Sequence, residues 1–372
     1  MQTGVAPGPL GVPNEFVKYA RHRPVLPDGK RGELEYLLPD VLRALFNGCV
    51  AVGRVPEPWR VTAIRPIPKT AAPASFDDTR PIAVGSCLPK LFAATLNGRL
   101  SGWAERRGKH APQQAGFRRH LSTTHHLFAL RHMVDWHRHT GHPLYLAFVD
   151  FRKAYDSVDR HLLWVKLEHL GVRGRFLAAL QSLYADDSAY VSLDGCRSAR
   201  FGSESGVKQG CPLSPTLFSL FFDHIADYLQ PPPGEGPWVP GLAQPLTSLL
   251  YADDVVIFAN SVRTLNLLLQ RLQSFCETWG MAVNTAKTKV MMVSGSAHAR
   301  HTFYNGDHPV RFGPRLQSQP LERVRSYKYL GIEVEATGGF GGALAGAARR
   351  CRGPGAPRHV RPLRTIRPLG LV

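Results

Sequence analysis

The sequence predicts an α+β fold in which an antiparallel sheet is backed by helices. Two apolar runs, 249–250 and 255–258, flank a short acidic turn, and this pattern is typical of a β-hairpin. A third apolar run, 146–149, has the character of a further strand. Residues 262–279 carry apolar side chains at helical spacing and are followed by Gly280, a typical helix stop. We expect this helix to pack behind the hairpin.

The turn of the predicted hairpin is the tetrad Tyr251-Ala252-Asp253-Asp254. Adjacent carboxylates repel each other and are costly to desolvate unless a cation lies between them. Divalent hard metals with oxygen ligands satisfy this requirement, so the turn is a candidate metal site. A solvated turn that binds nothing is the alternative interpretation.

A third carboxylate, Asp150, directly follows the run 146–149. If this strand pairs beside the hairpin, Asp150 and Asp253 lie close together. Three carboxylates at strand ends could bind two Mg²⁺ ions roughly 3.5–4 Å apart, one activating an attacking hydroxyl and the other neutralising a leaving oxygen. The arrangement therefore predicts phosphoryl-transfer chemistry with Mg²⁺, or with Mn²⁺ in its place.

Further motifs lie in a fixed order around the acidic residues. They are Trp59 to Lys69 (WRVTAIRPIPK), Thr79-Arg80-Pro81-Ile82, Gln114-Ala115-Gly116-Phe117, Gly206 to Phe218 (GVKQGCPLSPTLF), Asn284 to Thr288 (NTAKT) and Tyr327 to Ile332 (YKYLGI). Together with the two acidic motifs, this set resembles the reverse transcriptases of non-LTR (LINE-type) retrotransposons. The resemblance extends from residue 8 to about residue 334.

The resemblance implies a right-hand polymerase fold with fingers and palm. We expect an N-terminal extension or start of the fingers at 1–57, the fingers at 58–145 and the palm, the reverse transcriptase core, at 146–335. Residues 336–372 are rich in Gly, Ala, Pro and Arg and contain no acidic residue, so we expect a disordered tail. Relatives would carry a thumb here. The sequence thus predicts a missing thumb, as in a truncated or frame-shifted copy of a retroelement.

The resemblance also implies roles around the metal ions and the sugar. Asp150 and Asp253 would bind both ions with help from the Phe151 carbonyl, and Asp254 would complete the acidic cluster. Tyr155 would be the steric gate that excludes a ribose 2′-hydroxyl. Gln209 would contact the incoming nucleotide.

The remaining implied roles concern the phosphates and the primer. Arg80 and Lys69 would bind the triphosphate, because Arg suits planar phosphate geometry and Lys acts as a point charge. Lys287 would approach the pyrophosphate leaving group as a proton donor, with a solvated lysine as the alternative. The primer grip would be formed by Tyr329, Leu330 and Gly331.

A second tetrad, Tyr184-Ala185-Asp186-Asp187, repeats the acidic turn letter for letter. Leucines and phenylalanines between residues 163 and 183 recur mostly at three- and four-residue steps with a break at Gly171, so this copy ends a helical stretch. We interpret Asp186 and Asp187 as an exposed pair at a helix end, without a catalytic role.

The chain is strongly basic, with a formal net charge of +18 and a pI near 10.0. This charge favours a polyanionic partner bound through its phosphates. The six cysteines show no CxxC spacing and indicate neither a zinc knuckle nor a disulfide framework. We expect the histidines between residues 120 and 142 on an exposed basic helix. The sequence predicts no membrane segment, and we expect an intracellular protein, nuclear or cytoplasmic.

Three functions remain open at this point. The leading one is an RNA-directed DNA polymerase whose partners are an RNA template, a DNA primer and deoxynucleoside triphosphates. A group II intron-type reverse transcriptase shares the acidic triad, but the run from Gln114 to Phe117 argues against it. The non-enzymatic alternative is a truncated, inactive remnant that only binds nucleic acid.

Overall fold

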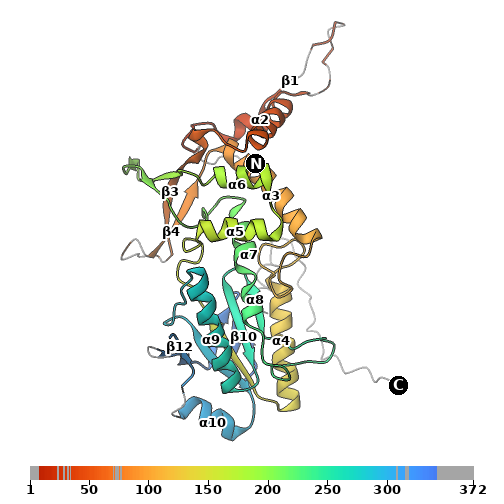
Figure 1. The fold of residues 1–372 in the computed structure, drawn as a ribbon, viewed down its shortest axis with the longest axis vertical. Helices are drawn as coiled ribbons and strands as arrows, with labels where there is room; N and C mark the ends of the chain where they lie inside the picture. The colour runs from red at the N-terminus through yellow and green to blue at the C-terminus, as the bar shows by residue number, and fades with distance from the viewer. Residues whose placement is uncertain are drawn as a thin grey trace, which may run out of the picture.

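The computed structural model describes residues 8–341, apart from 23–24, 28–29, 32, 34, 70, 72–74, 76–77, 307–308 and 315–317. The predicted tail lies outside the described residues from position 342 onward. The helices are α1 (Asn14–Tyr19), α2 (Pro39–Val52), α3 (Cys87–Arg106), α4 (Thr123–Thr140), α5 (Arg160–Leu170), α6 (Gly174–Ser182), α7 (Ser214–Phe222), α8 (Ile225–Tyr228), α9 (Val262–Trp279), α10 (Ala297–Asn305) and the 3₁₀ helix η1 (Glu57–Arg60). The body is elongated, with α2 near one end and α10 near the other (Figure 1).

A five-stranded sheet carries the predicted acidic motifs. Its strands, in spatial order, are β14 (Glu322–Arg323), β11 (Lys289–Ser294), β5 (Leu144–Val149), β10 (Asp254–Ala259) and β9 (Ser248–Tyr251). Strand β5 is buried along its whole length and runs antiparallel to both of its neighbours. The predicted hairpin is β9–β10, with Asp254 paired to Tyr251. The α+β prediction is therefore confirmed, and the sheet is antiparallel from β11 to β9, whereas the edge strand β14 pairs parallel with β11.

Each face of this sheet is covered by its own apolar core. Ala147 and Val149 of β5 belong to the core shared with α7 and α9, while Leu146 and Phe148 belong to the core shared with α4. Side chains alternate between the faces of a strand, which explains this division. Helices α9 and α4 lie on opposite sides of β10 (Figure 1).

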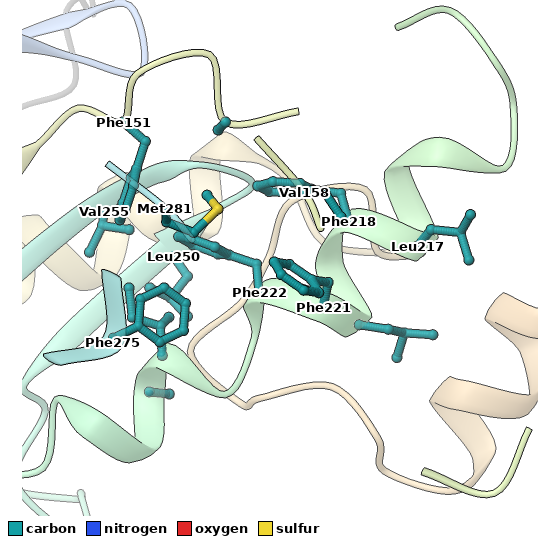
Figure 2. Packing of buried hydrophobic residues seen from close by; sticks show 14 of the residues in the cluster. Phe151, Val158, Leu217, Phe218, Phe221, Phe222, Leu250, Val255, Phe275 and Met281 are labelled. Atoms are coloured by element: carbon teal, nitrogen blue, oxygen red, sulfur yellow. The ribbon is translucent and has the colours of Figure 1, made fainter. Parts of the chain in front are cut away.

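The core on the α9 side is built around aromatic rings. Phe222 contacts Phe151 with ring centroids 5.1 Å apart and Phe275 with centroids 5.7 Å apart, both edge to face (Figure 2). Helix α9 begins after Ser261, whose hydroxyl accepts a hydrogen bond from the Thr264 N–H, and ends at Gly280 in a left-handed conformation. Its bounds, Val262–Trp279, are those that the sequence predicts.

A second sheet lies toward the α2 end of the molecule (Figure 1). Its strands, in spatial order, are β4 (Thr79–Val84), β3 (Val61–Pro68), β6 (Ser188–Leu193) and β7 (Cys196–Arg197), with β8 (Phe201–Gly202) also paired to β6. Strands β6 to β8 come from the segment assigned to the palm, yet β6 pairs with β3 of the finger segment, and β7 and β8 pair with β6. The chain therefore returns to the finger sheet between the two acidic motifs.

Short strands complete the described part of the fold. They are β1 (Arg21–His22) paired with β2 (Glu35–Tyr36), β12 (Arg311–Phe312) paired with β13 (Gln319–Pro320), and the sheet of β15 (Ser326–Tyr329), β16 (Ile332–Glu335) and β17 (Phe340–Gly341). No helix among the described residues combines the length and the apolar character that a membrane crossing requires.

Two sequence predictions about polar side chains need correction. Asp186 is exposed as predicted, but the Asp187 side chain is only 4% exposed because it pairs with Arg160 and Lys208. The histidine prediction is wrong for His126 and His137, which are buried on α4. These two residues are separated by about three helical turns and therefore share the face toward the sheet. Burial lowers the pKa of both rings.

Candidate active site

The acidic turn lies at the tip of the β9–β10 hairpin, beside the end of β5. Ala252 has a φ of 57°, a left-handed conformation that is uncommon outside glycine. Strand β5 pairs Val149 with Val255, so Asp150 leaves the strand next to Asp254. The fold thus brings together carboxylates that lie about a hundred residues apart in the sequence, as the strand prediction requires.

The three carboxylates interact electrostatically. Burial, followed by the charges of Asp253 and Asp150, raises the pKa of Asp254 to about 6. Burial is also the main cause that raises the pKa of Asp253, and the Asp150 charge adds to it. Mutual repulsion of this kind is what a bound cation would relieve. Within the described chain, however, no three His, Cys, Asp or Glu side chains already form a metal-ligand group.

The backbone around Asp150 is fixed by the segment that precedes β11. The Asn284 N–H donates to the Asp150 carbonyl at 2.7 Å, and the Asp150 N–H donates to the Thr288 hydroxyl at 3.2 Å. Phe151 lies opposite Val283 in an antiparallel bridge. The hydrogen bonds of this bridge are made by the flanking residues, from the Arg152 N–H to the Ala282 carbonyl and from the Asn284 N–H to the Asp150 carbonyl. The Phe151 carbonyl therefore makes no hydrogen bond to the segment of Val283. This carbonyl is therefore available as an oxygen ligand on the side away from Val283.

An open cleft with a volume of about 1310 Å³ lies beside the acidic turn. Eight predicted site residues line it: Lys69, Arg80, Asp150, Phe151, Tyr155, Gln209, Asp253 and Lys287. Cationic side chains from β4, from the end of β3 and from the segment before β11 thus share one cleft with the carboxylates of Asp150 and Asp253. Asp254 does not line this cleft. Burial is the main cause that raises the pKa of Tyr327 and Tyr329, and the Asp254 charge adds to the shift of both.

Tyr155 forms part of the cleft wall. Its ring stacks on Phe218 with centroids 4.5 Å apart and an interplanar angle of 8°. Burial and the nearby Asp253 charge raise the pKa of its hydroxyl far above the ordinary value. Next to it, the Gln209 amide donates to Asp156 Oδ1 at 3.3 Å. The ring is therefore held in a fixed position between the apolar core and the carboxylates.

The predicted primer-grip residues form the tip of the β15–β16 hairpin. Leu330 and Gly331 have φ values of 46° and 84°, and positive values at both positions are typical of a two-residue type I′ turn. The hairpin packs on the α4 side of the sheet, where the Tyr327 ring stacks on Phe148 with centroids 4.3 Å apart. Burial, followed by the Asp150 and Asp254 charges, raises the pKa of Tyr327 to about 12. The grip hairpin therefore adjoins the carboxylates.

A buried amide, for which the sequence suggested no role, fixes the acidic turn. Gln114 is fully buried, and its Oε1 accepts hydrogen bonds from the N–H groups of Ala252 at 2.9 Å and Gly116 at 2.8 Å. Its Nε2 donates to Asp223 Oδ1 at 3.1 Å. A Cβ on Gly116 would lie 2.2 Å from the Ala252 nitrogen, so only glycine fits there. The QAGF motif was the available signal for Gln114, whereas nothing local marks Asp223.

Replacement of this amide should destabilise the protein. In Gln114→Met, which keeps a side chain of similar length, the buried N–H groups of Ala252 and Gly116 lose their acceptor. Each unpaired buried group costs about 1–3 kcal/mol, and urea unfolding measures the loss. The control is Gln113→Met, because the Oε1 of Gln113 has no hydrogen-bond partner among the described residues and its loss should change little. Equal unfolding free energies for the two variants would contradict the assignment.

Comparison with known proteins identifies the family. Residues 67–334 match the family described as reverse transcriptase (RNA-dependent DNA polymerase). The chain belongs to this reverse transcriptase family. The retrovirus-related Pol polyprotein from the type-2 retrotransposable element R2DM of Drosophila melanogaster is 30% identical over 329 residues, which is 84% of this chain and 29% of that protein. The RNA-directed DNA polymerase from the mobile element jockey of Drosophila melanogaster is 28% identical over 317 residues, which is 80% of this chain and 32% of that protein.

These relatives confirm the resemblance to the reverse transcriptases of non-LTR retrotransposons. The reverse transcriptase chain spans about three-tenths of the length of the curated relatives that it matches. Among solved structures, apo telomerase from Candida tropicalis truncated from its C-terminal domain aligns with 88% of this chain and 64% of that chain. The sequence identity is 13% and the TM-score is 0.49.

Proposed function

We propose that this chain acts as an RNA-directed DNA polymerase that joins deoxynucleotides to the 3′-hydroxyl of a DNA primer on an RNA template. The observation that carries the proposal is the shared cleft, in which Asp150 and Asp253 lie with Tyr155, Gln209 and Arg80. Carboxylates suit metal ions, an aromatic wall suits a sugar, and cationic side chains suit a triphosphate. The net charge of +18 supports binding of the template–primer phosphates.

Two Mg²⁺ ions, or Mn²⁺, would be held by Asp150, Asp253 and the Phe151 carbonyl, with Asp254 completing the acidic cluster. This donor set fits such an ion, because it consists of hard oxygen atoms whose negative charges repel one another. When bound, the ions would activate the primer hydroxyl and neutralise charge on the leaving oxygen.

The other side chains of the cleft orient the nucleotide. Arg80 and Lys69 would bind its triphosphate, and Gln209, whose carbonyl accepts a hydrogen bond from the Ala83 N–H of the strand that carries Arg80, would contact the nucleotide beside them. The primer oxygen would bond to the α-phosphorus and lose its proton to water. As the bond between the α-phosphorus and the pyrophosphate oxygen breaks, Lys287 would give a proton to the pyrophosphate. Positioning and electrostatic stabilisation supply most of the rate in such reactions.

The grip hairpin would position the other reactant. The Asp254 charge acts on the Tyr329 hydroxyl, and Tyr329, Leu330 and Gly331 would bring the primer end toward the carboxylates. In this arrangement the primer and the nucleotide approach the acidic turn from different sides. For this activity we also propose an intracellular site of action, nuclear or cytoplasmic.

Primer extension tests the proposal directly. The chain is mixed with a DNA primer annealed to an RNA template, deoxynucleoside triphosphates and Mg²⁺, and fluorescence anisotropy records template–primer binding in parallel. We expect extension that copies the template sequence and stops when EDTA removes the metal. Binding without extension would refute the polymerase and favour the inactive remnant. Failure of both binding and extension would refute both proposals.

A further inference from the structure

The second acidic tetrad forms a buried ionic cluster directly behind the cleft. The Asp187 carboxylate accepts a hydrogen bond from Arg160 at 2.6 Å and lies 3.4 Å from the Lys208 ammonium. The Tyr184 ring lies beneath both cations, with the guanidinium 5.1 Å and the ammonium 5.3 Å from its centroid. The neighbouring Asp186 side chain is 92% exposed. Two residues with the same chemistry therefore occupy opposite environments.

The cluster contains one more cation than anion, and this imbalance makes Asp187 important. Arg160 and Lys208 have side chains only 11% and 16% exposed, so solvent screens their mutual repulsion weakly. Burial lowers the pKa of Lys208, while the Asp187 charge acts in the opposite direction. Without Asp187, two buried cations would face each other with no anion between them.

The two cations also fix a loop of the cleft. This 206–209 loop consists of Gly206, Val207, Lys208 and Gln209. Arg160 Nε donates to the Gly206 carbonyl at 2.9 Å, and the Lys208 ammonium donates to the Leu183 carbonyl at 3.1 Å. The cluster thus anchors the 206–209 loop at its beginning and at the residue before Gln209.

On its other side the 206–209 loop contacts the segment of the steric gate. The Val207 N–H donates to the Tyr155 carbonyl at 2.9 Å, and the Gly206 N–H donates to the Val158 carbonyl at 2.8 Å. A Cβ on Gly206 would lie 2.8 Å from Asp156 Cα, so the two backbones are as close as glycine permits. A shift of the loop would therefore displace both the Gln209 amide and the Tyr155 ring.

We propose that Asp187 is a positioning residue for the incoming nucleotide. It holds Arg160 and Lys208 together, and through them it fixes the 206–209 loop and the Gln209 side chain in the cleft. The second tetrad thus acts as the anchor of the nucleotide-binding loop rather than as a second metal site. This inference rests on the proposed polymerase function, because it assigns a step of nucleotide binding.

The test compares Asp187→Asn with Asp186→Asn, two identical substitutions at adjacent positions. Asp187→Asn should raise the KM for deoxynucleotides by tenfold or more, up to about a hundredfold, as expected for displaced binding groups. The Kd for the template–primer should stay within twofold of the parent value, because the phosphate contacts of the duplex are unchanged. Asp186→Asn should match the parent in both. The inference would be overturned if the two variants had equal KM values for deoxynucleotides. It would also be overturned if Asp187→Asn lost affinity for the template–primer by as large a factor as its KM for deoxynucleotides rises.

A second variant covers the case in which Asp187→Asn does not fold. Lys208→Met leaves one cation paired with one anion, so it removes a loop anchor without stranding a buried charge. It should also raise the KM for deoxynucleotides, and in the double variant with Asp187→Asn the two effects should not multiply. An unchanged KM in Lys208→Met, or independent effects in the double variant, would contradict the coupling.

Amide hydrogen exchange separates this inference from the polymerase proposal. The Gly206 and Val207 amides should exchange faster in Asp187→Asn than in Asp186→Asn, and in Lys208→Met than in the parent. This holds whether or not the chain extends a primer. One outcome is that the parent fails to polymerise while the Gly206 and Val207 amides still exchange faster in the variants. That result would support Asp187 as the anchor of the 206–209 loop and refute its role in nucleotide binding. Equal exchange in all the folded variants would overturn the anchor itself.

Discussion

Asp253→Asn is expected to reduce primer extension by at least about a thousandfold, because the loss of a proposed metal ligand would remove several kcal/mol of transition-state stabilisation. The same change should raise the stability of the metal-free protein. Asp253 is a half-buried carboxylate that repels Asp150 and Asp254, and a neutral amide removes this repulsion. Activity and stability should therefore move in opposite directions, which general misfolding would not produce.

Single-turnover extension and thermal melting in EDTA measure the two effects. The stability difference should depend on pH. A carboxyl group such as Asp254, with a pKa of about 6 in the fold and 3.8 in the unfolded chain, contributes stability below pH 3.8 that is lost as the pH rises through 6. Asp253→Asn lacks one repelling charge, so its free energy of unfolding should fall less than that of the parent between pH 3.8 and 6. Asp186→Asn is the exposed control, and a variant that melts below the parent at pH 8 would contradict the repulsion.

Tyr155→Ala is expected to weaken discrimination against ribonucleotides by about 10- to 200-fold, the range for opening space around one small group. The Tyr155 ring is held in place in the parent because it stacks on Phe218 and packs against the apolar core. The ratio of kcat/KM for a deoxynucleotide to that for its ribonucleotide measures the effect. Tyr155→Phe keeps the ring and should retain the parent ratio. An unchanged ratio in the alanine variant would remove the gate assignment.

Elements with local sequence signals were predictable. The apolar runs around the acidic turn predicted β9 and β10, and the spacing of leucines with Gly280 predicted α9 from its first residue to its last. The approach of Asp150 to the turn followed from one further assumption, that β5 pairs beside the hairpin. In each case a short segment contains its own signal, either alternation, helical periodicity or a stop residue.

Features that depend on distant partners were not predictable. Asp187 is buried because Arg160 and Lys208 reach it from α5 and from the 206–209 loop, and its own neighbours in the sequence gave no sign of either. The return of β6 to the finger sheet likewise depends on pairing with β3. Gln114 and Asp223 meet across more than a hundred residues. The tertiary structure, rather than local propensity, decides each of these positions.

The close contact at Gly116 has a consequence for how such genes decay. The atom that excludes a side chain there is the main-chain nitrogen of Ala252, which every amino acid carries, so no change at position 252 can make room. At a position that faces a flexible side chain, the neighbour can move to accommodate a replacement. The main-chain nitrogen of Ala252 that faces Gly116 cannot be removed by any substitution. Loss of this glycine codon in a genomic copy should therefore mark an element whose acidic turn no longer assembles, even where the aspartate codons survive.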